Sequence, residues 1–406
     1  MRTIVETAKT ASVECALDWR SPYARHTERY FFDKIDFWRD LFPGSLGDEL
    51  SRLPVGGVAE TSLAAGELGG PYDARQMKPL DKRYLELRLR SGRTIAPRRG
   101  RFYPRGLAAA ATDSFPGDTR PFRYLEPDAT HCALDLNHPL ARYGARFSTR
   151  IMETLDAREE HGGRCNDVIH DMTTNGPGLQ AALPDMDTDF FAADSFARED
   201  EGSDGEFYQQ PRLVNHIDTT AIAHISALYG RFLHPGMQVL DLMSSWTSHL
   251  PDGAQDLDVT GLGMNAAELE HNPQLTARIV HDLNRDPALP FAAQSFDIAL
   301  CTVSVEYLTQ PVEVFSEIAR VLRPGAPFVV TFSERWFPPK VIRLWTELHP
   351  FERMGLVIDY FRQAGLHANL GTESIRGYPR PADDKYARTL RDSDPVYAVW
   401  GYVQTQ

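Results

Sequence analysis

The stretch FDIALCTVSVEYLTQPVEVFSEIARVLRPGAPFVVTFS, residues 296–333, decides the fold of the chain. Its apolar run at 296–304 predicts a strand, 311–324 predicts a helix, and the apolar run at 327–333 predicts a second strand. Short apolar strands that alternate with helices are typical of a mostly parallel sheet covered on both faces. This stretch therefore predicts a doubly wound α/β domain.

The same alternation extends outward from this stretch in both directions. A helix is expected within 211–233, where Ile222, Ile225 and Leu228 share one face. These elements together predict a Rossmann-like domain over residues 205–406. We expect its other strands at 237–243, 258–264, 277–283 and 397–403, and its other helices at 265–272 and 354–365.

The N-terminal part of the chain follows a different pattern. Residues 1–155 contain short apolar runs such as HCALDL (131–136), separated by glycine and proline turns, and little helix. We expect a β-rich α+β domain there. Residues 156–204 are acidic and irregular, which favours a linker that partly wraps the following domain.

The composition excludes several classes of protein. The 406 residues include 43 Lys and Arg against 56 Asp and Glu, and the formal charge of −13 provides no basic field for nucleic acid. No run approaches the ~18 apolar residues of a membrane span, and the opening residues lack the apolar core of a signal peptide. The 4 cysteines are scattered. We therefore expect a reduced, cytoplasmic protein without a disulfide framework.

We expect no metal site. His161, Cys165, His170 and Asp171 lie close together in the sequence, but their spacing matches no standard zinc pattern. Surface loops explain these residues adequately.

The expected ligand site lies at the carboxyl ends of the predicted strands, because doubly wound sheets bind ligands there. Two interpretations compete. Residues 261–266, GLGMNA, fit the G-x-G-x-x-A pattern of a dinucleotide fold, with Asp282 as the ribose-binding acid. However, Pro273 interrupts the following helix, and the strand at 237–243 is left without a role.

The second interpretation rests on four blocks, namely VLDLMSSW (239–246), DVTGLGMN (258–265), IVHDLNRDPALPF (279–291) and the opening stretch. In order and spacing they resemble class I S-adenosylmethionine-dependent methyltransferases, of the type 11-like group. The most specific part is LPFAAQSFDIALCTVSVEYL (289–308), followed by IARVLRPGAPFVV. The resemblance implies S-adenosyl-L-methionine as the cofactor.

The resemblance also assigns roles at the strand ends. Asp241 corresponds to the acid that organises the loop beside the amino-acid moiety. Ser304 follows the fourth strand, where the family's loop faces the sulfonium. The remaining cofactor-binding positions are Met264 and Asn265, where the family usually carries an acid for the ribose hydroxyls, and Asp282 and Leu283, which meet the adenine.

The loop after the strand at 237–243 departs from the family pattern. Ser244, Ser245 and Trp246 replace the usual glycine-rich motif, and the ribose-binding acid is missing. The serines can donate hydroxyls to a ligand, and Asn265 can still hydrogen-bond a hydroxyl through its amide. Trp246 is either an aromatic wall of the site or a core side chain, and the sequence leaves both readings open.

The segment before strand 237–243 carries the candidate catalytic residues. A lead-in helix of the family often lies over cofactor and substrate. His216 is therefore a candidate general base, and Tyr208 a candidate for orienting the nucleophile. The alternative is an ordinary helix N-terminus, with Asp218 as its cap and Arg212 in a surface ion pair.

The N-terminal half has a fainter resemblance, carried by FPGSLGDELSRLPVGG (42–57) and DLNHPLA (135–141). These segments resemble the SlyD-type FKBP peptidyl-prolyl isomerases, in which the second one directly follows an inserted flap. The resemblance implies an FKBP-like domain over residues 1–155 that contacts peptides.

Three functions are compatible with these observations. The leading hypothesis is S-adenosylmethionine-dependent methyl transfer to a small-molecule acceptor. The alternatives are a cofactor-free binding module and a peptidyl-prolyl isomerase whose methyltransferase-like half is regulatory. Titration with S-adenosylhomocysteine separates the first hypothesis from the other two.

Overall fold

The computed structural model describes residues 10–85, 87–88, 94–155 and 164–405. The chain divides into two compact units, Met1–Phe190 and Phe191–Gln406. The division falls inside the 156–204 segment in which we expect a linker. His161 lies outside the described residues.

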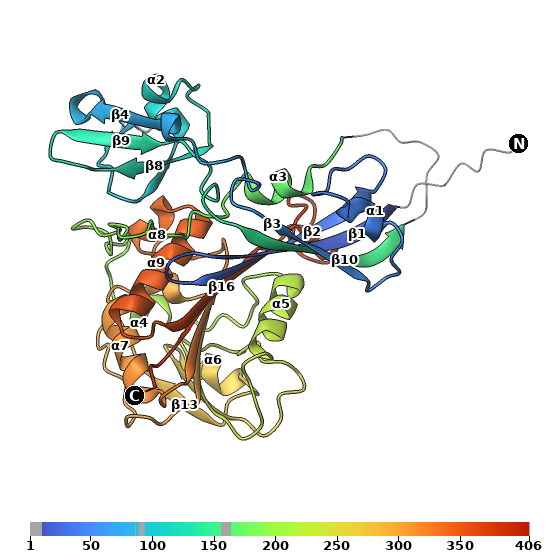
Figure 1. Ribbon diagram of the computed structural model, residues 1–406. Helices are drawn as coiled ribbons and strands as arrows, with labels where there is room; N and C mark the ends of the chain where they lie inside the picture. Colours follow the sequence, from blue (N-terminus) through green and yellow to red (C-terminus); the bar gives the residue numbers. More distant parts are fainter. Residues whose placement is uncertain (1–9, 86, 89–93, 156–163, 406) are drawn as a thin grey trace, which may run out of the picture. The chain divides into compact units, whose positions relative to one another are not determined.

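The C-terminal unit is built on a twisted sheet with the strand order β13-β12-β11-β14-β15-β17-β16 (Figure 1). The strands from β13 to β15 pair in parallel. β17 pairs antiparallel with both of its neighbours, β15 and β16. The bounds are β11 Gln238–Leu242, β12 Asp258–Gly263, β13 Ala277–Val280, β14 Ile298–Thr302, β15 Pro327–Phe332, β16 Ala368–Arg376 and β17 Val396–Tyr402.

Helices cover both faces of this sheet (Figure 1). On one face, Val329 of β15 lies in a buried cluster with Ile225 and Leu228 of α5. On the other face, the ring of the preceding residue, Phe328, lies 4.9 Å from that of Phe315 in α7. The helices are α4 Asp204–Phe207, α5 Thr219–Tyr229, α6 Ala266–His271, α7 Pro311–Val321, α8 Arg343–Glu347 and α9 Pro350–Gln363.

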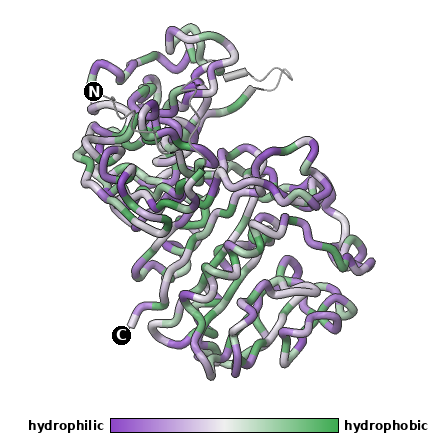
Figure 2. Tube along the Cα trace, turned by 90° about the vertical axis from the view of Figure 1, so that its right-hand side faces the viewer, coloured by the Kyte–Doolittle hydropathy of each residue, from purple (hydrophilic) through white to green (hydrophobic). Residues whose placement is uncertain are grey.

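The predicted doubly wound α/β fold is therefore confirmed for the C-terminal unit. Figure 2 shows hydrophobic stretches along its central strands and hydrophilic loops around them. No described helix has both the length and the apolar character needed to cross a membrane.

The order of the strands creates a switch point beside β11. The chain runs from β11 outward to β12 and β13, then returns to the other side of β11 as β14. The loops that leave β11 and β14 therefore diverge to opposite sides and open a crevice at the carboxyl ends of the strands.

Two expectations about the elements need correction. The helix expected within 211–233 begins only at Thr219, because the side chain of Asp218 accepts a hydrogen bond from the backbone N–H of Ala221 and caps it there. The strand expected at 277–283 ends at Val280, so that Asp282 lies in the loop beyond it.

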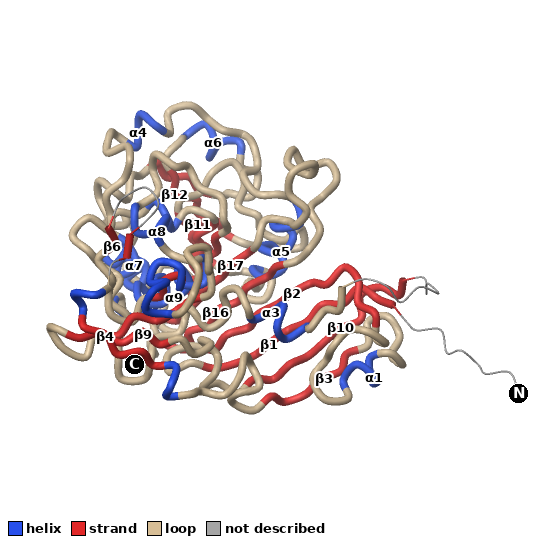
Figure 3. The backbone as a smooth tube through the Cα atoms, turned by 90° about the horizontal axis from the view of Figure 1, so that it is seen from above, coloured by secondary structure: helices blue, strands red, loops and turns tan. Residues whose placement is uncertain are grey.

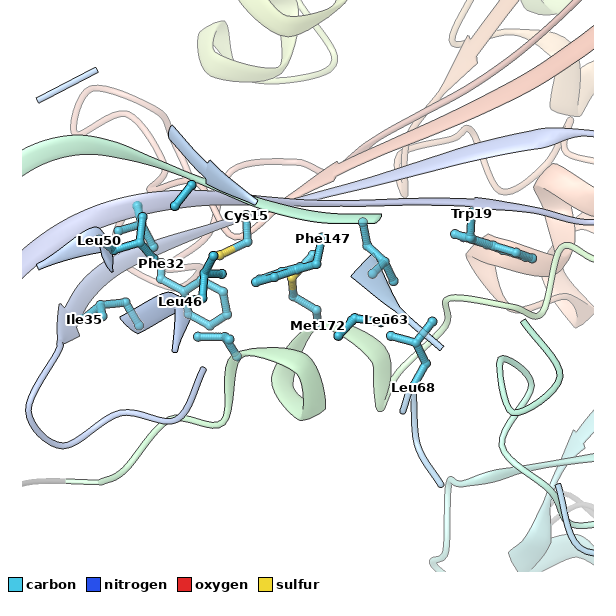
Figure 4. Packing of buried hydrophobic residues seen from close by; sticks show 14 of the residues in the cluster. Cys15, Trp19, Phe32, Ile35, Leu46, Leu50, Leu63, Leu68, Phe147 and Met172 are labelled. Carbon is cyan, nitrogen blue, oxygen red and sulfur yellow. The ribbon is translucent and has the colours of Figure 1, made fainter. Parts of the chain in front are cut away.

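The N-terminal unit contains a sheet of long antiparallel strands in the order β2-β1-β10-β3, which lie side by side in Figure 3. Cys15 and Phe147 point from one face of this sheet toward Met172 of α3 (Figure 4). The bounds are β1 Thr10–Arg20, β2 Arg25–Asp36, β3 Val58–Leu63, β10 Ala145–Leu155, α1 Leu46–Leu50 and α3 Val168–Thr173.

A second, smaller sheet is inserted between β3 and β10 in the order β4-β9-β8-β7. The first five residues of the apolar run HCALDL form β9, and DLNHPLA begins at the last residue of this strand. The many strands confirm a β-rich unit, whereas the FKBP-like fold and its peptide contact stay predictions. The bounds are β4 Met77–Asp81, β5 Leu87–Arg88, β6 Thr94–Ile95, β7 Phe102–Pro104, β8 Pro121–Leu125, β9 His131–Asp135 and α2 Ala109–Thr112.

Residues 191–204 belong to the C-terminal unit and are bound to it. The fully buried ammonium of Lys340 donates to the carbonyl oxygens of Asp200 (3.1 Å) and Gly202 (2.8 Å). It also pairs with the carboxylate of Asp204 at 3.1 Å. The acidic segment is therefore anchored here by a buried cation.

Candidate active site

A cavity of about 340 Å³ opens at the carboxyl ends of β11, β12 and β14. Its volume is within the range of small-molecule sites. The eleven residues singled out from the sequence all line it, although they are spread over about a hundred positions of the chain. They are Tyr208, His216, Asp241, Ser244, Ser245, Trp246, Met264, Asn265, Asp282, Leu283 and Ser304.

Asp241 holds the loop that follows β11. Its buried carboxylate accepts hydrogen bonds from the hydroxyls of Ser244 and Ser248, the latter at 2.6 Å. Burial raises the pKa of Asp241 to about 6, while the two hydroxyls act in the opposite direction. The acid therefore organises the loop, while its expected place beside the amino-acid moiety of a cofactor stays a prediction.

The same loop lies directly against the end of β12. The N–H of Ser244 donates to the carbonyl of Leu262 at 2.8 Å. A Cβ added to Gly263 would lie 2.1 Å from the carbonyl oxygen of Ser244. Gly263, the last residue of β12, therefore has no room for a side chain as long as this loop keeps its place.

A carboxylate reaches the cavity from the following helix instead. Glu268 in the first turn of α6 accepts from the hydroxyl of Ser245 and from the N–H of Arg212, both at 2.7 Å. We did not single out Glu268 from the sequence. Its signal was the spacing N-x-x-E from Asn265 to Glu268, which is typical of a helix start.

Asn265 is the N-cap of α6. Its side-chain oxygen accepts from the N–H of Glu268 at 3.1 Å. Its amide donates to the carbonyls of Tyr208 (2.8 Å) and Gln209 (3.0 Å), which uses both amide hydrogens. The amide hydrogens therefore fix the lead-in chain over the site. The expected bond to a ribose hydroxyl stays a prediction and would use the amide oxygen as acceptor.

The side chain of Asp282 caps a turn and also lines the cavity. One carboxylate oxygen, Oδ1, accepts from the N–H groups of Asn284 (3.0 Å) and Arg285 (3.2 Å). The other oxygen makes no hydrogen bond to any residue that the structure describes. Next to it, Leu283 is buried and also lines the cavity.

Trp246 is half-buried and borders the cavity. Its indole N–H donates to the carbonyl of Val214 at 3.3 Å. The ring therefore joins the loop after β11 to the lead-in segment. This placement favours the wall reading over the core reading.

The segment before α5 was expected to be either part of the active site or an ordinary helix start, and the structure shows features of both. Asp218 caps α5, as the structural alternative predicted. Arg212, however, forms no ion pair with any described residue, and its guanidinium lies 5.0 Å from the ring centre of Phe337. His216 is exposed and lines the cavity, with its ring 5.0 Å from that of Phe337.

The titration of these residues follows from their surroundings. Partial burial lowers the pKa of His216, and the positive charges of Lys385 and Arg212 lower it further. Burial raises the pKa of Tyr208, assisted by the negative charge of Asp204. His216 is therefore neutral near pH 7, while Tyr208 keeps its proton.

The loop after β14 brings a strained backbone to the cavity. Val303 has a φ of 47° and Ser304 donates its hydroxyl to the carbonyl of Thr302 at 2.8 Å. Positive φ at a β-branched residue is unfavourable and is typical of functional sites. Ser304 is thereby held on the cavity wall.

A buried carboxyl group follows in the same loop. Glu306 is fully buried, and neither of its side-chain oxygens has a hydrogen-bond partner among the described residues. Burial raises its pKa to about 8. Glu306 is therefore protonated at neutral pH, which its place in the sequence VSVEYL did not indicate.

Comparison with known proteins agrees with this geometry. Residues 246–330 match the family model described as "Methyltransferase domain". This region runs from the loop after β11 into β15, and it includes half of the residues that line the cavity.

Three curated relatives carry methyltransferase names. A demethylmenaquinone methyltransferase of Renibacterium salmoninarum is 32% identical over 107 residues, which are 26% of this chain and 45% of the relative. A ubiquinone/menaquinone biosynthesis C-methyltransferase of Roseobacter denitrificans is 33% identical over 110 residues, 26% of this chain and 41% of the relative. Methyltransferase phqN of Penicillium fellutanum is 40% identical over 79 residues, which are 18% of this chain and 24% of the relative. This chain therefore spans less than half the length of each.

Proposed function

We propose that the C-terminal unit binds S-adenosyl-L-methionine and transfers its methyl group to a small-molecule acceptor. The observation that carries this proposal is the position of the cavity. It lies at the switch point of the parallel sheet, the stretch that matches the methyltransferase domain provides half of its lining residues, and it is lined by the residues to which the resemblance assigns cofactor roles.

The side chains present suit the polar groups of this cofactor. The unpartnered oxygen of Asp282 can accept from the adenine amine, and the carboxylate of Glu268 can accept from the ribose hydroxyls. Ser245 belongs to the loop that would border the amino-acid moiety. When bound, the cofactor supplies a methyl group on a sulfonium, which is open to in-line displacement.

The chain itself needs mainly to align the two reactants and to handle one proton. His216, neutral near pH 7, is suited to accept a proton from the acceptor. Tyr208 keeps its proton and is suited to orient the acceptor by donating a hydrogen bond. Trp246 and Trp336 border the cavity and provide apolar surface beside the reactants.

The acceptor class rests on two observations. The names of two relatives refer to quinone compounds, which are small molecules. The formal charge of −13 makes a nucleic acid an unsuitable acceptor. A small organic acceptor is therefore the proposal, and the cytoplasmic location stays a prediction.

Isothermal titration of the full chain with S-adenosylhomocysteine tests the proposal directly. We expect saturable binding of one molecule per chain. A cofactor-free binding module would give no heat of binding, and that result would overturn the proposed function.

Replacing Asp282 with asparagine is expected to weaken S-adenosylhomocysteine binding by roughly tenfold to a hundredfold. The asparagine oxygen keeps the cap on Asn284 and Arg285, but its NH₂ group faces the adenine amine as a second donor. Calorimetric titration measures the affinity, and thermal unfolding should show a smaller loss than for Asp282→Ala.

The matched control for this variant is Asp286→Asn. Asp286 caps a neighbouring turn by accepting from the N–H of Ala288 at 3.0 Å, and it does not line the cavity. Its variant should bind S-adenosylhomocysteine like the unmodified chain. Equal affinities of the Asp282 and Asp286 variants would remove Asp282 from the cofactor site.

Intrinsic fluorescence is expected to change when S-adenosylhomocysteine binds, and Trp246→Phe should remove most of that change. The reason is that Trp246 lies on the loop after β11, beside the expected amino-acid moiety. Trp336→Phe is the control, because Trp336 lines the part of the cavity beyond β15. A full response in a stable Trp246→Phe protein would contradict the assignment.

A further inference from the structure

The cavity has a second half that the cofactor residues do not occupy. Most of the residues assigned to the cofactor follow β11, β12 and β13, and Ser304 follows β14 directly beside them. The loop after β15 and the loop before β17 contribute Arg335, Trp336, Phe337, Lys385 and Tyr386 on the other side. The acceptor must therefore enter this second half.

In this second half of the cavity, the guanidinium of Arg212 is surrounded by three aromatic rings. Its guanidinium carbon lies 4.7 Å, 5.6 Å and 5.0 Å from the ring centres of Phe207, Tyr208 and Phe337. One terminal nitrogen donates to the carbonyl of Phe207 at 3.1 Å. Stacking and this bond hold the group in place, yet no carboxylate of the described residues lies within 4.0 Å of it.

Lys385 is a second cation on this wall. It is exposed and lies 5.0 Å from the ring centre of Tyr386, and no described carboxylate pairs with it. Both Lys385 and Arg212 depress the pKa of His216, so their fields overlap at the candidate base. Two cations that form no ion pair with a described residue therefore both act on the imidazole of His216.

Among the described residues, no acidic group of the cavity forms an ion pair with Arg212 or Lys385. Asp204 is paired with Arg198 at 2.8 Å and with Lys340 at 3.1 Å. Asp241 and Asp282 accept from hydroxyl and backbone N–H groups in the cofactor half. Glu268 accepts from the hydroxyl of Ser245 and the backbone N–H of Arg212, and its charge partly offsets the effect of the two cations on the pKa of His216. A positive, aromatic wall thus remains in a chain whose formal charge is −13.

We propose that the acceptor is a planar compound with a carboxylate-type anionic group, which Arg212 binds with the help of Lys385 while the aromatic side chains stack on its ring. This inference rests on the proposed function, because it places the acceptor in the half of the cavity that the cofactor leaves free. Arg212 acts in it as a specificity-determining residue.

Benzoate and benzamide test the proposal, because they have the same shape and differ in charge. Each is titrated into the full-length chain saturated with S-adenosylhomocysteine. We expect benzoate to bind at least about tenfold more tightly than benzamide. Arg212→Met should abolish this preference, Lys385→Met should reduce it, and Arg212→Lys should retain part of it because the charge is kept.

The control is Arg388→Met, which removes an exposed cation of the same loop as Lys385 that does not line the cavity. It should leave both affinities unchanged. Equal binding of benzoate and benzamide, or binding of neither, would overturn the inference. The proposed function would still stand in that case, provided that the chain binds S-adenosylhomocysteine.

Two further outcomes distinguish a failure of this inference from a failure of the proposed function. If Arg212→Met weakens S-adenosylhomocysteine instead and keeps the benzoate preference, Arg212 serves the cofactor's own carboxylate and the inference is wrong. If the unmodified chain binds no S-adenosylhomocysteine, the proposed function itself fails.

Discussion

Replacing Gly263 with alanine is expected to destabilise the C-terminal unit by about 3 kcal/mol and to lower its melting temperature by about 10 °C. The added Cβ would lie 2.1 Å from the carbonyl oxygen of Ser244, and a backbone atom in this loop cannot move alone. The loop holds Ser245 and Trp246 at the cavity, so S-adenosylhomocysteine binding should fall with stability. Urea unfolding and calorimetric titration measure the two effects.

Gly253→Ala is the control for this variant. No atom lies within 4 Å of the Cβ that it adds, so stability and binding should stay unchanged. A Gly263→Ala protein as stable as Gly253→Ala would show that the loop can retreat from β12. The close contact would then not be what excludes a side chain from this position.

The pH dependence of stability should change markedly in Glu306→Gln. The pKa of Glu306 is raised by burial to about 8 in the folded chain, against an ordinary value of 4.5. Between these values the folded state holds a proton that the unfolded state has lost, so stability falls as pH rises. The contribution is complete below about pH 4.5 and is lost as pH passes through about 8.

Glutamine fills the same space and cannot ionise. From pH 5 to pH 8 the free energy of unfolding should therefore fall by about 4 kcal/mol more in the unmodified chain than in the variant. Asp241, whose pKa is also raised, contributes equally to both proteins. Urea unfolding at several pH values measures the difference, and parallel pH profiles would contradict the buried, protonated state of Glu306.

The parts of this fold that sequence analysis could predict are those with apolar periodicity. The strands β11, β12, β14, β15 and β17 are short apolar runs, and α7 repeats its apolar residues every three to four positions. The strand β16 was missed for a physical reason. Thr372, Glu373 and Ser374 in its centre are buried although they are polar, so its sequence shows no apolar run.

The members of the site could be predicted, but their bonds could not. The strand-end rule brought Asp241, Asp282 and Ser304 to one cavity. The rule says nothing about hydrogen bonds between distant segments, such as that from Asn265 to Tyr208. Glu268 was missed because it lies one helical turn beyond the strand end, where the sequence shows only a helix cap.

The segment from Asp200 to Val214, which covers the cavity, is fastened mainly through its main chain. Lys340, Asn265 and Trp246 donate to its carbonyl oxygens, which every residue type provides. Substitutions along this cover are therefore expected to leave its path intact, except at Asp200 and Asp204, whose carboxylates pair with Lys340. Single substitutions along the cover therefore change the surface that faces the cavity without rebuilding the sheet beneath it.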